Sequence, residues 1–444
     1  MVKEKIARWF EVDNSAFIYP ITASKGEQNL FKLSAELTEE VDPELLSLAL
    51  SDIMPRFPSF NVKLGRSFFS YIFEENFEKP LVFTESDVIM RMIDFKENNG
   101  FLFRTTYFRH IISLEFFHVL TDGAGGLEFL KGLLLRYLQL KGYPVNGENI
   151  IPEYNSPPLA EESEDSFSAY YRRYKIKDLN LKSVTGSQGQ SFILNGMPFD
   201  TEGTGIINFQ TDVREILRQA KQYGATLTAY LTGLLMYSIY RVKVMGMPQK
   251  KLIQIFMPIN LRKIFPSVTL RNFTFMTKVS AKIVEKQELK DFVDIASEAL
   301  KSGVSKDKLQ RSISAVCQAE KNFFIRIAPL ALKYVVIKAI TAIMVSRSGQ
   351  TATLTSPGII PMPESLKPYV AHINMFLFPG RSTRLTVSAL TYNNELSCTF
   401  CRRFMDTEVE KFFIRYLSVN GAEVRVSGNF RELATKNTAG MEPV

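Results

Sequence analysis

The alternation of apolar and polar positions predicts a mixture of strands and helices in the first half of the chain. Strand-like stretches lie at 31–37, 67–73 and 111–117. Asp42-Pro43 opens a helix, because aspartate caps a helix well and proline suits its first position. Leucines at helical spacing predict another helix over 126–138. The first half is therefore expected to form a sheet covered by helices.

The second half begins the same plan again. Between the halves the composition changes to a Pro-containing, acidic and then Gly/Ser/Gln-rich stretch, which is typical of a crossover between domains. We expect an N-terminal domain at 1–175, a linker at 176–204 and a C-terminal domain at 205–444. The fold class is α/β, with two sandwiches of related architecture and a cleft between them. Strands are predicted at 205–210, 252–257, 352–355, 372–378, 385–392, 395–400 and 424–426, and helices at 213–223, after Thr226 and at 406–419.

The most apolar stretch of the chain covers residues 327–345. Lys333 and Lys338 interrupt it, so it falls short of the roughly 20 apolar residues that a membrane span requires. A buried helix is the favoured interpretation. A helix that lies against a membrane, or that lines a tunnel for an apolar substrate, is the alternative. No transmembrane span is predicted, and peripheral membrane contact stays open.

The composition limits which ligands and binding partners are expected. The net charge is +8, but the basic residues are scattered and no nucleic-acid-binding motif is present, so we expect no nucleic acid. A phosphate-bearing cofactor remains compatible with this charge. Three cysteines argue against a disulfide framework, and the N-terminus lacks the apolar core of a signal peptide, so we expect a cytoplasmic protein. Cys398 and Cys401 face opposite sides of a predicted strand, and no metal site is expected.

The candidate chemistry lies in His118-Val-Leu-Thr-Asp122-Gly123. His118 sits where a buried strand ends and a turn begins, a position that aims a side chain while exposing it. An imidazole can act there as a general base near neutral pH. Asp122 can orient the imidazole or anchor the turn by pairing with an arginine, and Gly123 leaves room in the cleft. Without a nucleophile motif nearby, the pattern favours direct attack of a hydroxyl or amine on an activated acyl group.

His118–Gly123 resembles the His-x-x-x-Asp-Gly signature of the CoA-dependent acyltransferase superfamily, which includes chloramphenicol acetyltransferase and peptide-synthetase condensation domains. Further segments resemble its bacterial alcohol acetyltransferase-like branch. They follow the family's order along nearly the whole chain. These segments are Trp9-Phe-Glu-Val-Asp-Asn14 with Ile18-Tyr-Pro20, Arg56-Phe-Pro-Ser-Phe60, Met257-Pro-Ile-Asn-Leu-Arg262 with Arg271-Asn-Phe273, and Leu354-Thr-Ser-Pro-Gly358.

The resemblance implies two chloramphenicol-acetyltransferase-like domains with an active-site tunnel between them. It makes His118 the catalytic base and Asp122 structural, with Arg262 as the expected partner of Asp122. Asn272, Thr355 and Ser356 would lie near the substrates and help to bind the oxyanion. Pro357 follows that pair and has no N–H, so the sequence leaves the oxyanion donor open. Phe117 stands where many relatives carry an additional histidine.

The implied activity is transfer of an acyl group, acetyl above all, from CoA to a hydroxyl or amine. Acyl-CoA is then a co-substrate, and no permanently bound cofactor is expected. Two alternatives remain: transfer from a carrier-protein thioester, and a catalytically silent binding or scaffold protein. The sequence does not identify the acceptor, and it allows a monomer or a dimer. His372, in an apolar strand, is predicted to be a core or tunnel residue rather than a second base.

Overall fold

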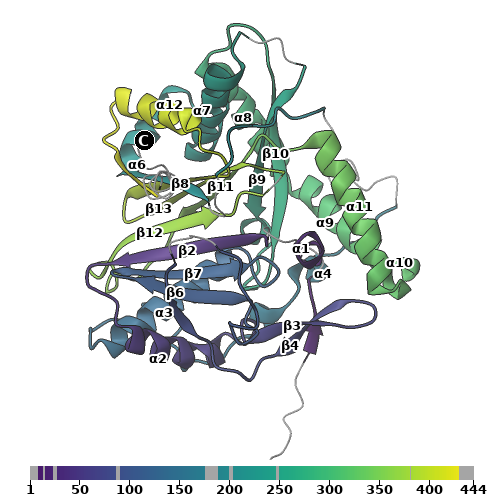
Figure 1. Ribbon diagram of the computed structural model, residues 1–444, viewed down its shortest axis with the longest axis vertical. Helices are drawn as coiled ribbons and strands as arrows, with labels where there is room; N and C mark the ends of the chain where they lie inside the picture. The colour runs from purple at the N-terminus through teal and green to yellow at the C-terminus, as the bar shows by residue number, and fades with distance from the viewer. Residues whose placement is uncertain are drawn as a thin grey trace, which may run out of the picture.

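The computed structural model describes residues 9–13, 16–23, 28–86, 91–175, 189–199, 204–246, 250–380 and 382–429. It contains two bodies, each a sheet covered by helices, stacked one above the other in Figure 1. The predicted α/β fold with two sandwich-like bodies is confirmed. Most of the predicted linker, at 176–188 and 200–203, lies outside the described residues.

The lower body in Figure 1 is built on a five-stranded sheet of order β12-β2-β7-β6-β5. Phenylalanine fills its core: the rings of Phe60 and Phe129 stack at 4.6 Å, and those of Phe31 and Phe116 at 5.1 Å. A small sheet, β1-β4-β3, flanks this body. The N-terminal half of the chain contributes β1 (Trp9–Glu11), α1 (Ile18–Thr22), β2 (Leu30–Leu37), α2 (Pro43–Ile53), β3 (Val62–Arg66), β4 (Tyr71–Glu75), β5 (Val82–Thr84), β6 (Phe103–Phe108), β7 (Ile111–Phe117), α3 (Gly123–Leu140) and α4 (Ser166–Ala169).

The upper body has a seven-stranded sheet of order β10-β9-β11-β13-β14-β8-β15, with α6, α7, α8 and α12 covering the face turned away from the lower body (Figure 1). A π-helical turn at Tyr240–Val244 extends α7. The elements after residue 204, among which β12 belongs to the lower sheet and α11 packs on the lower body, are β8 (Gly205–Asp212), α6 (Val213–Gln222), α7 (Leu227–Ile239), β9 (Leu252–Asn260), β10 (Thr274–Lys282), α8 (Leu289–Gly303), α9 (Lys306–Glu320), α10 (Phe323–Ile327), α11 (Leu330–Ser348), β11 (Ala352–Ile359), β12 (Val370–Leu377), β13 (Leu385–Tyr392), β14 (Glu395–Arg402), α12 (Glu408–Val419) and β15 (Arg425–Gly428).

Strand β12 joins the two bodies. It comes from the C-terminal half of the chain, yet it pairs antiparallel with β2 at the edge of the lower sheet. On the other side, the Asn374 side-chain oxygen accepts hydrogen bonds from Asn208 Nδ2, at 3.2 Å, and from the Ser397 hydroxyl of the upper sheet. The C-terminal domain predicted at 205–444 would therefore contribute this strand to the lower sheet. Edge pairing across domains leaves no pattern in the strand's own sequence.

Two further sequence predictions hold only in part, for a shared reason. The stretch 67–73 was predicted to be strand-like, and residues 71–73 lie in β4, but Ser67–Ser70 form the turn between β3 and β4, with Phe68 and Phe69 exposed. The apolar stretch 327–345 was predicted to be a buried helix, but α11 keeps one apolar face open to solvent. In both places apolar side chains lie outside the core. None of the helices in the described parts of the chain has the length and hydropathy of a membrane span.

Candidate active site

His118 directly follows β7 and is fixed on both sides. Its backbone N–H donates to the carbonyl oxygen of Asn29, at 3.0 Å, which continues the pairing of β7 with β2. Its imidazole stacks on the ring of Tyr19 in α1, with centroids 4.6 Å apart, and meets the edge of Phe31 at 5.2 Å. Burial among these rings lowers the pKa of His118 below its ordinary value of 6.5. The imidazole is therefore neutral at physiological pH.

Asn272, from the loop between β9 and β10, fixes the tautomer of His118. The Asn272 Nδ2 donates to the carbonyl oxygens of His118, at 2.9 Å, and Val119, at 3.4 Å. Because carbonyl oxygens only accept, the amide orientation is set, and Asn272 Oδ1 faces His118 Nδ1 at 3.0 Å. An amide oxygen cannot donate, so Nδ1 carries the proton and Nε2 presents a lone pair. Among the residues that the structure describes, no side chain hydrogen-bonds Nε2.

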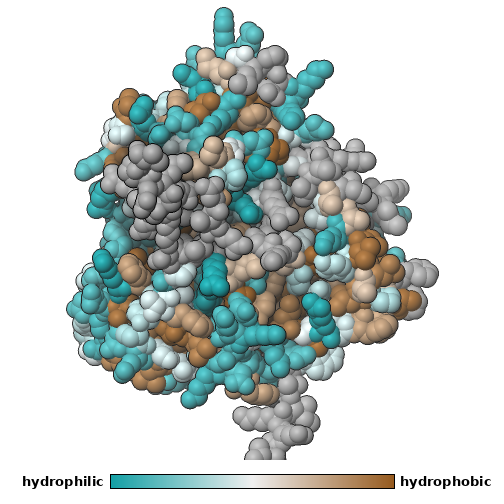
Figure 2. Space-filling view, viewed as in Figure 1, coloured by the Kyte–Doolittle hydropathy of each residue, from teal (hydrophilic) through white to brown (hydrophobic). Residues whose placement is uncertain are grey.

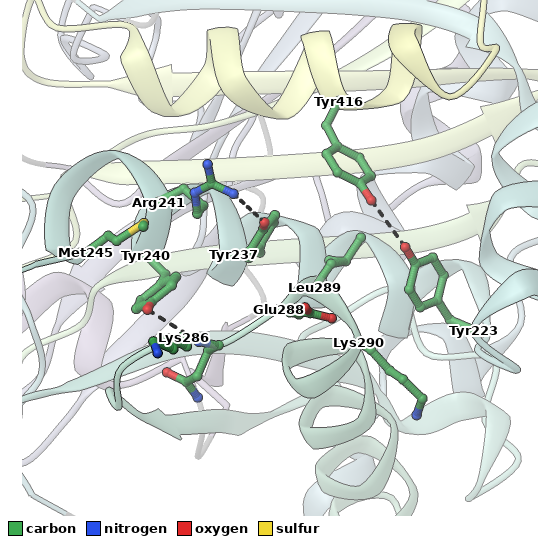
Figure 3. Close-up of a pocket in the computed structure, with 11 residues that line it drawn as sticks. Tyr223, Tyr237, Tyr240, Arg241, Met245, Lys286, Glu288, Leu289, Lys290 and Tyr416 are labelled. Atoms are coloured by element: carbon green, nitrogen blue, oxygen red, sulfur yellow. Dashed lines mark hydrogen bonds between the residues drawn. The ribbon is translucent and has the colours of Figure 1, made fainter.

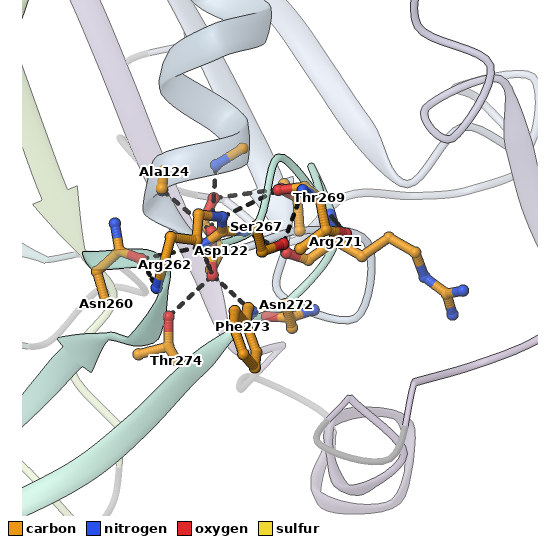
Figure 4. Close-up of polar contacts among 12 residues, drawn as sticks. Asp122, Ala124, Asn260, Arg262, Ser267, Thr269, Arg271, Asn272, Phe273 and Thr274 are labelled. Atoms are coloured by element: carbon orange, nitrogen blue, oxygen red, sulfur yellow. Dashed lines mark hydrogen bonds and ion pairs between the residues drawn. The ribbon is translucent and has the colours of Figure 1, made fainter. Parts of the chain in front are cut away.

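The carboxylate of Asp122 connects three parts of the chain (Figure 4). Its Oδ1 caps α3 by accepting from the backbone N–H groups of Ala124 and Gly125, both at 3.1 Å. Its Oδ2 accepts from the β9–β10 connection of the other body. The Oδ2 partners are Arg262 Nη1 at 2.8 Å, the Phe273 N–H at 2.8 Å and Thr274 Oγ1 at 2.9 Å.

These bonds define what Asp122 can do. Burial raises the pKa of this carboxyl, but the Arg262 charge and the hydrogen bonds outweigh it and hold the pKa below its ordinary value of 3.8. Both oxygens are occupied by partners other than His118. The structure thus brings Asp122 and Arg262 together, and the carboxylate makes no hydrogen bond to the imidazole. Its effect on His118 is that of a nearby negative charge, which partly offsets the effect of burial.

The loop that carries Asn272 is held against the lower body by further contacts. The Arg262 guanidinium donates to the carbonyl oxygens of Thr269, at 2.9 Å, and Arg271, at 2.6 Å, and so braces the loop from within. Asp13 accepts from the backbone N–H of Asn272 at 3.2 Å and ion-pairs with Arg271. Burial raises the pKa of Asp13 to about 7, more than the Arg271 charge lowers it. Asp13 belongs to the family-like opening of the sequence, and its neighbour Asn14 lies outside the described residues.

Gly125, rather than Gly123, is where this arrangement requires a glycine. A Cβ at Gly125 would lie 2.1 Å from the carbonyl oxygen of Leu270 and 2.3 Å from Thr121 Oγ1. These two atoms are themselves hydrogen-bonded at 2.6 Å, so the helix start and the loop are in direct contact. A Cβ at Gly123 would meet only the flexible end of Met375, at 2.8 Å. The room predicted at Gly123 therefore faces β12, and the close backbone approach is two residues further on.

Thr355 and Ser356 lie apart from this network. They sit in β11, where the pairing with β13 is interrupted between Thr355 and Gly358, around Pro357. In the described part of the chain neither residue hydrogen-bonds His118, and Ser356 Oγ accepts from Thr228 at 3.2 Å. His372 Nδ1 instead pairs with Glu395 at 2.6 Å, at the join between the bodies. Sequence reasoning assigned no role to Tyr19 or Asp13, because only the folded chain brings them to the site.

Comparison with known proteins places the fold among known structures. Residues 112–319, which include His118, Asp122, Arg262 and Asn272, match the alcohol acetyltransferase family. Among solved structures, TRI101 of Fusarium graminearum, complexed with coenzyme A and T-2 mycotoxin, superposes with a TM-score of 0.62 at 11% identity, covering 94% of this chain and 100% of that one. The chain has the fold of the CoA-dependent acyltransferases. The predicted resemblance is confirmed.

Two other structures with this acyltransferase fold are similar over the same length. Polyketide synthase associated protein 5 of Mycobacterium tuberculosis has a TM-score of 0.56 at 14% identity, covering 95% of this chain and 99% of that one. The nonribosomal peptide synthetase FmoA3 has a TM-score of 0.61 at 12% identity, covering 94% of this chain and 42% of that one. A search of curated proteins gives no significant match.

A separate cavity of about 370 Å³ lies in the upper body, between α7, α8 and α12 (Figure 3). Tyrosines line much of it, and the Tyr223 and Tyr416 hydroxyls are hydrogen-bonded at 3.1 Å. None of the site residues predicted from the sequence lines this cavity. Within the described residues, no cluster of His, Cys, Asp or Glu is arranged to hold a metal ion. The tunnel at His118 stays a prediction from the family resemblance.

The variant Asp122→Asn tests the structural role of the Asp122 carboxylate. It keeps the size of the side chain but removes the buried charge that pairs with Arg262, so the free energy of unfolding at pH 7 should fall by about 3–5 kcal/mol. Because folding lowers the pKa of Asp122, its stabilisation is complete above the ordinary value of 3.8 and is lost as the pH falls through the folded value. Urea denaturation should therefore show the gap between wild type and variant narrowing in acid.

Asp52→Asn is the matched control, since Asp52 pairs with Arg136 at 2.6 Å in a partly exposed position. It should cost about 1 kcal/mol or less. Equal losses in the two variants would contradict the anchor role of Asp122.

Proposed function

We propose that the protein transfers an acyl group, acetyl above all, from CoA to a hydroxyl or amine acceptor by direct attack, with His118 as general base. The observation that carries this proposal is the contact of Asn272 Oδ1 with His118 Nδ1, which leaves Nε2 as the basic nitrogen. The lowered pKa of His118 keeps that nitrogen unprotonated near neutral pH. The match to the alcohol acetyltransferase family supports the reaction class.

In the proposed reaction, Nε2 takes the proton from the acceptor as its oxygen or nitrogen attacks the thioester carbonyl carbon. The imidazolium that forms keeps its Nδ1–H on Asn272 Oδ1, and the buried Asp122 charge nearby favours its positive charge. When the C–S bond breaks, the Nε2 proton passes to the departing CoA sulfur. His118 returns to its starting tautomer, and no covalent acyl-enzyme is needed. Acyl-CoA is a co-substrate in this scheme.

For Asn272 the contacts favour a different role from the one predicted. The sequence placed it among the oxyanion donors, but its Nδ2 is already occupied by the carbonyl oxygens of His118 and Val119. We propose that it is a positioning residue for the imidazole. Thr355 and Ser356 stay predictions for substrate contact, and the hydroxyl of Ser356 still has its proton to donate, since its oxygen accepts from Thr228.

The alternative donor is a carrier-protein thioester, which is compatible with the structural similarity to a nonribosomal peptide synthetase. Both donors present the same thioester, so His118 serves either one. Free coenzyme A released from acetyl-CoA in the presence of a small alcohol or amine supports the CoA donor. Transfer only from an acylated carrier protein supports the alternative.

His118→Ala is the direct test of the base. Loss of a general base should lower the rate of acceptor-dependent thiol release from acetyl-CoA by about 10²–10⁴-fold, with the circular dichroism spectrum unchanged. His110→Gln, in the turn between β6 and β7, is the matched control and should keep the wild-type rate. If folded His118→Ala retains the full rate, His118 is not the base.

Asn272→Ala tests the positioning role. Freed from the amide, the imidazole can rotate and take either tautomer, so kcat/KM should fall by up to about 100-fold. The hydrogen bond to Asn272 raises the pKa of His118, so its loss should also move the acid limb of the kcat/KM profile to lower pH. A purely structural defect would lower the whole profile and leave that limb in place.

A further inference from the structure

Helix α11 has two apolar faces, and only one of them is packed. Leu330, Tyr334 and Ile337 lie against the core of the lower body. The opposite face consists of Leu332, Val335, Val336 and Ile340, whose spacing puts them on one side of the helix. All four are exposed, Val335 by 63%. A globular protein rarely leaves a continuous stripe of this kind open to water without a use for it.

Neighbouring segments extend this stripe into a surface. Ile325 and Ile327 of α10 are exposed, as are Phe68 and Phe69 at the tip of the β3–β4 turn, Phe68 by 70%. Hydrogen bonds hold that tip against α11: the Leu330 N–H donates to the Phe68 carbonyl oxygen at 2.8 Å, and Lys333 Nζ to that of Phe69 at 2.9 Å. Figure 2 shows apolar side chains gathered over the α10 end of the molecule. The α11 surface comprises Phe68, Phe69, Ile325, Ile327, Leu332, Val335, Val336 and Ile340.

Within the segments that carry the α11 surface, every charged residue is basic. The sequence from 321 to 348 contains five lysines and arginines and no aspartate or glutamate. Residues 64–70, at the tip of the β3–β4 hairpin, contain Arg66 and no acid, while Lys63 further back pairs with Glu74 at 3.7 Å. Lys321, Arg326 and Lys338 are exposed. Apolar side chains within a basic rim suit a surface that inserts among lipid tails while its cations meet anionic headgroups.

We propose that the α11 surface docks the protein onto an anionic lipid bilayer. A second copy of the chain fits this surface less well. In a symmetric dimer the same patch meets itself, so the cations of 321–348 would face cations with no acid to pair with. An anionic bilayer covers the same apolar side chains and supplies the missing negative charge.

The α11 surface also lies close to the candidate active site. Helix α1 lies beside α11 in Figure 1, and Lys333 Nζ sits 6.0 Å from the centre of the Phe17 ring that precedes α1. Tyr19, on α1 itself, stacks on His118. Docking would therefore place the bilayer on the outer face of α11, with α11 and α1 between it and the imidazole. Resting on the proposed function, this arrangement favours an apolar acceptor or acyl chain supplied from the lipid phase.

The experiment is co-sedimentation of the full chain with vesicles, in the absence of CoA and acceptor, so that its outcome does not depend on catalysis. Binding is expected to vesicles of phosphatidylglycerol and phosphatidylcholine, and much less to phosphatidylcholine alone. The double variant Val335→Glu/Val336→Glu should lower the partition coefficient on the order of 10-fold or more, because it places two anions in the contact.

Leu217→Glu/Val419→Glu is the matched control. It adds the same charge at exposed apolar positions of α6 and α12, on the upper body. It should bind vesicles almost as the wild type does. Equal loss in the two double variants would show attraction by net charge alone and overturn the proposal, as would no binding to anionic vesicles. A lipid-free dimer that only Val335→Glu/Val336→Glu dissociates, together with no vesicle binding, would assign the surface to self-association instead.

Discussion

The pairing of the Asp122 carboxylate with the β9–β10 connection is the interaction on which the rest of the site depends. One oxygen caps α3, and the other gathers a guanidinium, a backbone N–H and a hydroxyl from the opposite body. A charge this deeply buried is tolerated only with such partners. The same contact ends the turn after β7, starts the helix and sets where the second body meets the first. The carboxylate of Asp122 thus connects the two bodies.

The contacts of Asp122 affect the tautomer of His118 indirectly, through the position of Asn272. By holding the loop, Asp122 and Arg262 deliver Asn272 to the imidazole, where the Asn272 amide spans the side chain and the carbonyl oxygen of the same histidine. Tyr19 and Phe31 supply the apolar walls that lower the pKa of His118. Each contribution comes from a different segment of the chain, so the proposed base is complete only when both bodies are assembled. The requirement for two domains therefore follows from the histidine's own contacts.

Many of the strands and helix ends could be predicted from local sequence. The strand 111–117, the cap at Asp42 and the start of α7 after Thr226 are set by neighbours in the chain, and the structure confirms them. Arg262 was expected beside Asp122 through the family resemblance. The role of Asn272 could not be predicted, because its partner lies 154 residues away and the amide orientation depends on two backbone carbonyls. The exposed face of α11 could not be predicted either, because periodicity identifies apolar positions but does not show whether other residues cover them.

The proposed mechanism requires that Asn272 hold His118 with its proton on Nδ1 and with Nε2 unprotonated. The chain has only three histidines, so ring-nitrogen NMR of protein labelled with ¹⁵N-histidine can resolve each one, and the His118→Ala spectrum assigns His118. Above neutral pH, we expect His118 to show a protonated Nδ1 and an unprotonated Nε2. A proton on Nε2, or rapid exchange between the two tautomers, would contradict this expectation.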